Sequence, residues 1–249
     1  MQAKLTRRLG GGSQIGAAYT FSKAIDYSDN EELNFLLFPF PDYWQKNKGL
    51  ASFDRTHNFQ LYGLYELPLG RGKRFAQSGI GNALAGGWQL NWVFSHVSGT
   101  PFTISANDNA FNAAGNTETA DVVGPIHVTG CHRNDKSCAY FDTSAFVAPT
   151  GPRFGTGGRD IVRGPGFTNL DTSVFRNFKI TERFTLQFRA EAFGVTNTPH
   201  FFNPINASPT ANVSQANFGV ITRTLGVGGN EGTNLNGART FWFAGKLIF

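Results

Sequence analysis

The sequence is poor in charge and in cysteine, and it contains no long apolar run. Of its 249 residues only 16% are charged and two are cysteines. A transmembrane helix needs about 18 or more consecutive apolar residues, and no such stretch exists. No apolar segment follows the basic start of the chain, so we expect no secretory signal peptide there. The protein is therefore either cytosolic or part of a longer chain.

The motifs of enzymes and of nucleic-acid-binding proteins are also lacking. His57 lies close to Asp54, but no nucleophile is placed with them, and a role at the start of a strand fits better. The stretch GRGKR at 70–74 lacks the Gly-Lys-Ser/Thr ending of a phosphate loop and is interpreted as a turn. The net charge of +5 is otherwise spread over scattered residues. We expect no catalytic site, no cofactor, no metal and no nucleic-acid partner.

The two cysteines, Cys131 and Cys138, lie close together in CHRNDKSC. Such a pair is typical of a small disulfide loop in an oxidising compartment. A metal site is the alternative, but the spacing matches no zinc pattern. The sequence predicts a disulfide and a location outside the cytosol.

The abundant residues are Gly (30) and Phe (25), and apolar side chains alternate with polar ones. Alternation with a period of two predicts strands that are apolar on one face and polar on the other. No helical period is long enough to predict a helix. Seven strands are expected, at about 2–9, 14–22, 58–67, 88–95, 169–180, 184–192 and 241–249.

The lengths of the connections indicate which kind of β-protein this is. Tight turns are expected at 10–13 and near 181–183, whereas about 24–55, 100–168 and 197–238 form long connections. Transmembrane β-barrels have short turns on the periplasmic side and long loops outside. The connection at 68–87 is an exception, because it should be periplasmic and yet is long.

Strand length and aromatic content favour the same class. About ten residues of alternation are enough for a tilted strand to cross the hydrocarbon layer. Tyr and Trp rings are enriched at membrane interfaces, and the candidates for that position are Tyr19, Tyr65, Trp88, Trp92 and Trp242. The polar faces would line a wet lumen, where Arg189 and Glu191 are expected to pair. A soluble β-sandwich remains the alternative, although its strands and loops are usually shorter.

The chain ends on FWFAGKLIF, with apolar residues at alternate positions. A last strand of this kind suits a lipid-facing edge at the periplasmic side. The stretch resembles the C-terminal signal that the outer-membrane barrel-assembly machinery reads, through Phe241, Phe243, Leu247 and Phe249. Gly245 interrupts that pattern.

Several segments together resemble the C-terminal end of TonB-dependent outer-membrane receptors. They are most similar to the subfamily with a carboxypeptidase-regulatory-like N-terminal domain, and their order and spacing both fit. The segments are AAYTFSKAID (17–26), FDRTHNFQLYGLYELPLGRGKRF (53–75), GGWQLNWVFSHVSGTPFT (86–103), NLDTSVFRNFKITERFTLQFRAEAFGVTNTPHF (169–201) and FWFAGKLIF (241–249).

The resemblance implies an all-β fold, an antiparallel up-and-down transmembrane β-barrel with long extracellular loops. Barrels of this family have about 22 strands around a plugged lumen. Residues 1–249 would then be the C-terminal portion of such a barrel, about seven strands, with the plug and the early strands absent. The partners implied are outer-membrane lipid, the barrel-assembly machinery, and TonB acting through the missing N-terminal part.

The implied function is uptake of a bulky ligand, such as a metal chelate or a glycan, across the bacterial cell outer membrane. A non-transporting outer-membrane barrel that serves as an adhesin or scaffold is the alternative. Long outer loops usually capture the substrate. The candidate ligand loop carries Phe38, Phe40, Tyr43 and Trp44, although packing within the loop would also explain these rings. The glycine-rich stretch at 155–166 is interpreted as flexible turns.

Overall fold

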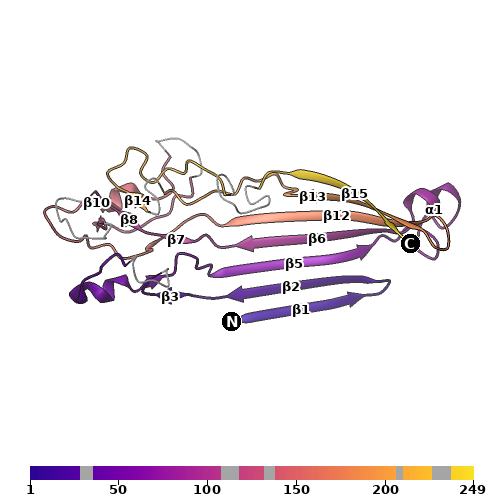
Figure 1. The fold of residues 1–249 in the computed structure, drawn as a ribbon, viewed down its shortest axis with the longest axis horizontal. Coiled ribbons are helices and arrows are strands. Elements are labelled where there is room, and N and C mark those ends of the chain that lie inside the picture. Colours follow the sequence, from indigo (N-terminus) through magenta and orange to yellow (C-terminus); the bar gives the residue numbers. More distant parts are fainter. Residues whose placement is uncertain (29–35, 108–117, 132–137, 206–209, 226–236) are drawn as a thin grey trace.

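The computed structural model describes residues 1–28, 36–107, 118–131, 138–205, 210–225 and 237–249, and its main element is one antiparallel sheet (Figure 1). The strand order is β1-β2-β5-β6-β12-β13-β15, so each strand pairs with the next long strand of the chain. These strands coincide with the seven expected from alternation. They are β1 (Gln2–Leu9), β2 (Ser13–Phe21), β5 (His57–Glu66), β6 (Trp88–Val97), β12 (Phe167–Lys179), β13 (Thr185–Phe193) and β15 (Thr240–Ile248).

The register of all six ladders places most apolar residues of the strands on one face of the sheet, with exceptions such as Tyr62 and Phe175 on the other. Residues directly opposite one another in an antiparallel pair share a face. Leu61 lies opposite both Ala17 and Phe94, and Phe94 lies opposite Leu170. At the other side of the sheet, Ala190 lies opposite Phe243. A slip of one residue in any ladder would mix the two faces, so the alternation and the register support each other.

Two glycines allow rings from neighbouring strands to lie across the sheet. On the apolar face, the Trp92 ring occupies the place where a Cβ of Gly63 would be. On the polar face, the Tyr62 ring covers Gly16 in the same way. An aromatic ring over a cross-strand glycine replaces the packing that the missing side chain would supply. A side chain at Gly16 or Gly63 would displace the ring.

The short and long connections lie at opposite ends of the strands (Figure 1). The β1–β2 turn places Gly11 and Gly12 at positive φ, where glycine is favoured. The β12–β13 turn is closed by Thr181, whose Oγ1 accepts hydrogen bonds from the N–H groups of Arg183 and Phe184. The C-terminus lies at this turn end.

The connection at 67–87 also lies at the turn end, although it is long. It contains a short helix, α1 (Gly79–Ala85), which the sequence did not predict. Gly70 N–H donates to the Phe75 carbonyl, and Arg71 N–H donates to Asn82 Oδ1, so the connection folds back on itself. The stretch 70–74 does form a turn, as the sequence predicted.

The long connections 22–56, 98–166 and 194–239 meet at the other end, and we call their described parts the loop layer. They are not structureless, because they contain short ladders and 3₁₀ turns. The pairs are β3 (Ile25–Asp26) with β4 (Gly49–Leu50), β7 (Pro101–Phe102) with β11 (Val162–Arg163), β8 (Ile104–Ser105) with β14 (Ala211–Asn212), and β9 (Asp121–Val122) with β10 (Phe146–Val147). The 3₁₀ turns are η1 (Pro41–Asn47) and η2 (Thr143–Ala145).

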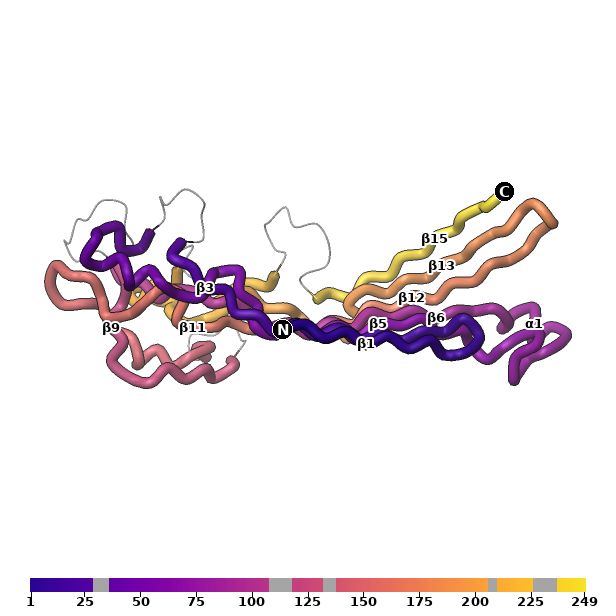
Figure 2. Tube along the Cα trace, turned by 90° about the horizontal axis from the view of Figure 1, so that it is seen from below, coloured from indigo at the N-terminus to yellow at the C-terminus, as the bar shows by residue number. Residues whose placement is uncertain are grey.

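The sheet does not close into a barrel. β1 and β15 stand at the two ends of the strand order and are not paired with one another. Figure 2 shows β13 and β15 rising away from the level of β1, β5 and β6 toward the turn end, so the sheet curves to one side. Every residue of β1 is exposed. The fold therefore presents two open strand edges.

Candidate functional site

The polar face of the sheet carries several hydrogen-bonded groups of amide and hydroxyl side chains. Ser95 Oγ donates to Gln60 Oε1 at 2.5 Å, and Gln60 Nε2 donates to Asn58 Oδ1 at 2.8 Å. Between β6 and the next strand, β12, Asn91 Nδ2 donates to Ser173 Oγ at 3.2 Å. Side chains of this kind satisfy one another and still offer donors and acceptors to a partner. This face can therefore bind a polar, hydrogen-bonding partner.

Arg189 and Glu191 both lie on this polar face, where they were expected. Arg189 lies opposite Phe175, and Glu191 lies opposite Ser173. The ion pair expected between them does not form. Residues two apart on a strand are separated by about 6.6 Å, and the Arg189 guanidinium instead donates from Nε to Gln187 Oε1 at 2.9 Å and lies over the Phe175 ring.

The apolar face carries interacting polar groups near each of its two ends. At the loop end, Tyr19 Oη and His57 Nδ1 are 2.7 Å apart, and His96 Nδ1 is 2.8 Å from Thr168 Oγ1. His57 thus begins β5, as expected. At the turn end, the Arg176 guanidinium lies over the Phe178 ring at 4.4 Å. Polar and aromatic groups at both rims of an apolar band are typical of a membrane-spanning sheet.

Trp88 lies on this apolar face, but Trp242 does not. Trp242 is opposite Glu191 in the ladder between β13 and β15, which places it on the polar face. Its ring packs against Phe193. Trp242 therefore belongs to the lining of the polar face, whereas Tyr19 and Trp88 lie at the two rims of the apolar face.

The loop layer has a hydrophobic core of its own. Phe141 is fully buried and packs edge-on against Phe146 and Phe218, with ring centroids 5.6 and 5.3 Å away. Around them lie buried apolar residues from β7, β8, β10 and β11 of the 98–166 connection and from β14 of the 194–239 connection. The buried cluster comprises Phe102, Ile104, Ala120, Tyr140, Phe141, Ala145, Phe146, Val162, Ala211 and Ile221.

A buried arginine joins two of the long connections. Arg159 forms an ion pair with Asp26, and its Nε donates to the Asn47 carbonyl at 3.0 Å. The glycine-rich stretch 155–166 therefore does not form the flexible turns that were expected. It packs tightly, because Gly155 lies against the backbone of Thr119 and Val162 is in the core.

A second ion pair joins the same two connections. Arg163 Nη2 lies 2.7 Å from Asp54 Oδ2, and the Asp54 side chain is fully buried. Burial alone would raise the pKa of Asp54, but the hydrogen bonds from Ala24 N–H and Arg163 outweigh it and hold that pKa below the usual value. Sequence analysis found no role of this kind for Asp54. The sequence did contain a signal for these ion pairs. Arg159 and Arg163 are charged residues within the glycine-rich stretch 155–166 of a chain that has little charge overall.

The candidate ligand loop separates into a buried part and an exposed part. Phe38 is fully buried and packs against Phe154 at 5.0 Å, so it holds the loop and cannot contact a ligand. Phe40 and Tyr43 also touch the Phe154 ring, yet both remain about 40% exposed. Trp44 is similarly exposed and stacks on Tyr27. The exposed rings of Phe40, Tyr43 and Trp44 form what we call the aromatic patch.

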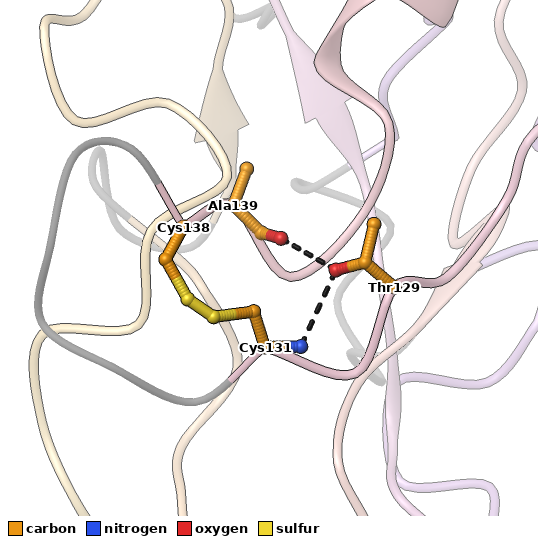
Figure 3. Close-up of a disulfide and its surroundings, with 4 residues drawn as sticks. All are labelled: Thr129, Cys131, Cys138 and Ala139. Atoms are coloured by element: carbon orange, nitrogen blue, oxygen red, sulfur yellow. Dashed lines mark hydrogen bonds between the residues drawn. A yellow bond between two sulfur atoms is a disulfide. The ribbon is translucent and has the colours of Figure 1, made fainter.

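Cys131 and Cys138 are joined by a disulfide in the loop layer (Figure 3). Thr129 closes the base of the loop, because its Oγ1 donates to the Ala139 carbonyl at 2.5 Å and accepts from Cys131 N–H at 3.3 Å. An open hollow of about 400 Å³ lies beside it. The hollow is lined by Thr129, Cys131, Cys138, Ala139, Phe141, Asp142 and Thr143.

The last strand exposes the residues of the expected assembly signal. Phe241, Phe243 and Leu247 lie on the apolar face of β15, and the ring of Phe249 is 6.4 Å from that of Phe184. All four signal residues are at least half exposed, with Phe243 at 72%. A Cβ at Gly245 would meet no atom within 4 Å. The whole apolar face of β15 is thus available to lipid or to another protein.

The comparisons with known proteins bear on the class of the fold. A family model described as "Outer membrane beta barrel domain" matches residues 1–235, which include six of the seven strands of the sheet and most of the loop layer. No match was found among curated proteins or among solved structures. Within the described residues, none of the helices has the length and apolar character needed to span a membrane.

Proposed function

The chain belongs to the family of outer membrane β-barrel domains, and we propose that it forms the C-terminal strands of a TonB-dependent receptor. Its place is the bacterial outer membrane, where the apolar face of the sheet contacts lipid. Residues 1–249 would supply about seven strands of a larger barrel, with the remaining strands and the plug supplied by preceding sequence.

The observation that carries this proposal is the open sheet with complementary faces. All strands of the sheet are in register, one face is apolar, and β1 and β15 each leave an edge unpaired. An unpaired edge inside a bilayer is costly, because no water is present to satisfy its N–H and C=O groups. Additional strands between β15 and β1 would satisfy both edges and turn the polar face into the lining of a lumen.

The loop layer suits the capture of a bulky ligand outside the cell. The buried core joins the 98–166 and 194–239 connections, and the contacts of Phe38 with Phe154 and of Arg159 with Asp26 attach the 22–56 connection, which bears the aromatic patch. Tyr and Trp rings offer an apolar surface with polar groups at the edge, which suits stacking on a sugar or a metal chelate. We expect such a ligand to be taken up with energy delivered through TonB.

The test is uptake by cells that carry or lack the full gene. Deleting the gene should abolish the accumulation of one labelled metal chelate or oligosaccharide from a panel. Dissipating the proton gradient should abolish it as well. Accumulation that continues in the deletion strain for every ligand of the panel would contradict the proposal.

A matched pair of variants connects uptake with the aromatic patch. Trp44→Ala removes an exposed ring of the patch, whereas Phe53→Ala removes an exposed loop ring that has no aromatic partner among the described residues. Loss of one stacking contact should weaken ligand binding roughly fivefold or more. The control variant should bind as the unchanged protein does, and equal binding by both variants would remove the patch from the account.

The assembly machinery is the second partner that we propose. Phe249→Ala removes the last aromatic of the apolar pattern, and Ile248→Ala changes its neighbour on the other face. Only the first should reduce the fraction of the chain inserted in the outer membrane, measured by protease protection in cells. Equal insertion of both variants would exclude Phe249 from the signal.

A non-transporting adhesin or scaffold is the second candidate, and the separate core of the loop layer favours it. A packed and disulfide-linked platform can present a binding surface without any transport. If deletion of the gene leaves uptake unchanged but reduces attachment of cells to a surface, this second function replaces the first.

A further inference from the structure

The connection at 67–87 is the one long segment at the turn end of the sheet, and neither barrel closure nor ligand capture requires it. It bears three basic residues, Arg71, Lys73 and Arg74, and no acidic one. Turns at the periplasmic side of a barrel are usually short. An extended, basic and partly helical connection therefore calls for a separate explanation.

The helix of this connection exposes its large apolar side chains. Ile80 is 78% exposed and Leu84 is 71% exposed. Residues four apart lie on the same side of a helix, so the two side chains form one apolar ridge. Phe75, which is also half exposed, precedes the helix. Apolar side chains this exposed are unfavourable in water but stable in contact with a lipid surface.

The end of the helix is joined to the lipid-contacting face of the sheet. Trp88 Nε1 and Arg176 Nη1 both donate to the Leu84 carbonyl, at 3.0 and 2.7 Å. Trp88 and Arg176 lie opposite each other on the apolar face of β6 and β12. In Figure 2 the connection descends on the side of the sheet away from that toward which β13 and β15 rise. The ridge is thus continuous with the surface that contacts lipid.

The charges of the connection fit an anionic surface. Lys73 is engaged by Glu66 at 2.8 Å, but within the described part of the chain neither Arg71 nor Arg74 forms an ion pair with a carboxylate. Arg74 lies over the Phe75 ring, 5.3 Å from its centroid. A guanidinium beside apolar rings can hold its stem in the acyl region and its head among phosphates.

We propose that the connection at 67–87 is an interfacial anchor that binds anionic phospholipid in the leaflet at the turn end of the barrel. Ile80 and Leu84 enter the boundary between headgroups and acyl chains, and Arg71 and Arg74 bind the headgroup phosphates. The anchor fixes the depth and tilt of β5 and β6 in the bilayer. This proposal rests on the location of the chain in the outer membrane, and it does not depend on a transported ligand.

The apolar part is tested by labelling the full protein in vesicles of phosphatidylethanolamine and phosphatidylglycerol. A fluorophore on Ile80→Cys should be quenched by lipids that carry a quencher near the headgroup and protected from aqueous iodide. Val123→Cys is the matched control, since Val123 is an exposed apolar residue of the loop layer. Its label should respond to iodide alone. Iodide quenching at both positions without lipid quenching would overturn the anchor.

The basic part is tested with the double variant Arg71→Gln, Arg74→Gln. The unchanged protein should retain phosphatidylglycerol in preference to phosphatidylcholine, measured by mass spectrometry of the protein released from detergent. The double variant should lose about tenfold in that preference at low salt. The control, Arg223→Gln with Arg239→Gln, removes the same charge at the loop end and should keep the preference. An unchanged preference in the first variant, or an equal loss in both, would overturn the assignment.

Discussion

The sheet and the loop layer differ in how far they expose the same type of side chain, as Phe243 in the sheet and Phe141 in the loop layer show. Phe243 is 72% exposed on the apolar face of β15, whereas Phe141 is fully buried among other rings. The sheet places its apolar residues outward and joins its polar residues in a network on the other face. The loop layer does the reverse and gathers a large set of its apolar residues in a buried core.

The difference follows from the two solvents that surround the regions. Lipid tails are as apolar as a protein core, so side chains that meet them need no burial within the protein. Water surrounds the loop layer, where stability comes from removing apolar area from the solvent. One chain therefore follows two opposite rules, and the boundary between them lies where the strands enter the loops.

Removing a core ring should produce the largest effect, and only in the loop layer. Phe141→Ala leaves a cavity in a fully packed site and should cost about 3–5 kcal/mol. The loop layer should then be cut rapidly by protease, while the sheet keeps its circular dichroism. Phe243→Ala is the matched control and should leave the protection of the loop layer unchanged. Equal protection of both variants would contradict a separate core.

Breaking the buried ion pair should rank next. Asp54→Asn leaves Arg163 without its charged partner and should destabilise the loop layer by about 3 kcal/mol. Among the residues that the structure describes, no ion pair lies on the apolar face of the sheet, so the strands should remain intact. Hydrogen exchange of the amides in 155–166 measures the effect, and unchanged exchange would show that the pair does not hold the connections together.

Acid should reproduce this effect, with a sign that follows from the lowered pKa of Asp54. A carboxyl whose pKa is lower in the folded state gives stability that is present above its unfolded value of 3.8 and is lost as the pH falls below it. Asp121 should contribute stability with the same pH dependence, because the hydrogen bond from Arg153 holds the pKa of Asp121 below its usual range. Protease protection of the loop layer should decline below about pH 4, and less so in Asp54→Asn.

A charge placed on either of two adjacent residues of β5 tests whether the two faces of the sheet meet different environments. Leu61→Arg places a charge at the middle of the apolar face and should cost about 2–4 kcal/mol in a bilayer. Gln60→Arg, on the neighbouring residue, faces the polar side and should be tolerated. Urea titration in vesicles measures both. Equal costs would mean that the two faces meet the same environment.

The disulfide should stabilise the loop layer alone. Cys131 and Cys138 close a loop with a sequence separation of seven, for which loop-closure entropy gives about 2.5 kcal/mol. Cys131→Ser with Cys138→Ser should lower the thermal midpoint of the loop layer without changing insertion of the sheet. Mass spectrometry without reductant checks the bond itself, and a free thiol on both residues of the natural protein would remove it from the account.

The smallest effect is expected at high pH. Burial raises the pKa of Tyr140 to about 12, from an ordinary value of 10. Between these values only the unfolded state releases the proton, so the stability of the loop layer should fall as the pH rises from 10 to 12. Tyr140→Phe should lack this alkaline decline, and an identical decline in both proteins would assign it to other groups.

The strands could be predicted from sequence because a period of two leaves a direct trace in residues such as Leu61, Phe94 and Leu170. Each strand must contact lipid along its whole length, so the pattern runs unbroken for about ten residues. The pairing of β1 with β2 and of β12 with β13 followed as well, since a short turn such as 10–12 leaves two strands only one another to join. The same period predicted that Arg189 and Glu191 share one face, and both lie on the polar face.

The loop layer could not be predicted, because its core is assembled from pieces two residues long. Val162 and Ile104 belong to different ladders, and no local period marks either of them. Phe38 and Trp44 are both aromatic residues of the same short segment, so sequence does not separate them. Phe38 is nevertheless buried against Phe154, which lies more than 100 residues further along the chain, whereas Trp44 stays exposed. Glycines at 155–158 suggested flexibility, whereas they permit the close approach of two backbones.

The central claim is that alternate residues of the sheet face lipid while the loop layer is surrounded by water. The most direct measurement places a spin label at each residue from 58 to 65 of β5 in the membrane-inserted protein. Collision with oxygen, which dissolves in lipid, should peak at Phe59, Leu61, Gly63 and Tyr65, and collision with a water-soluble nickel chelate should peak at the residues between them. A label at Val123 should meet the nickel chelate only. Uniform access of the nickel chelate along all eight positions would contradict the account.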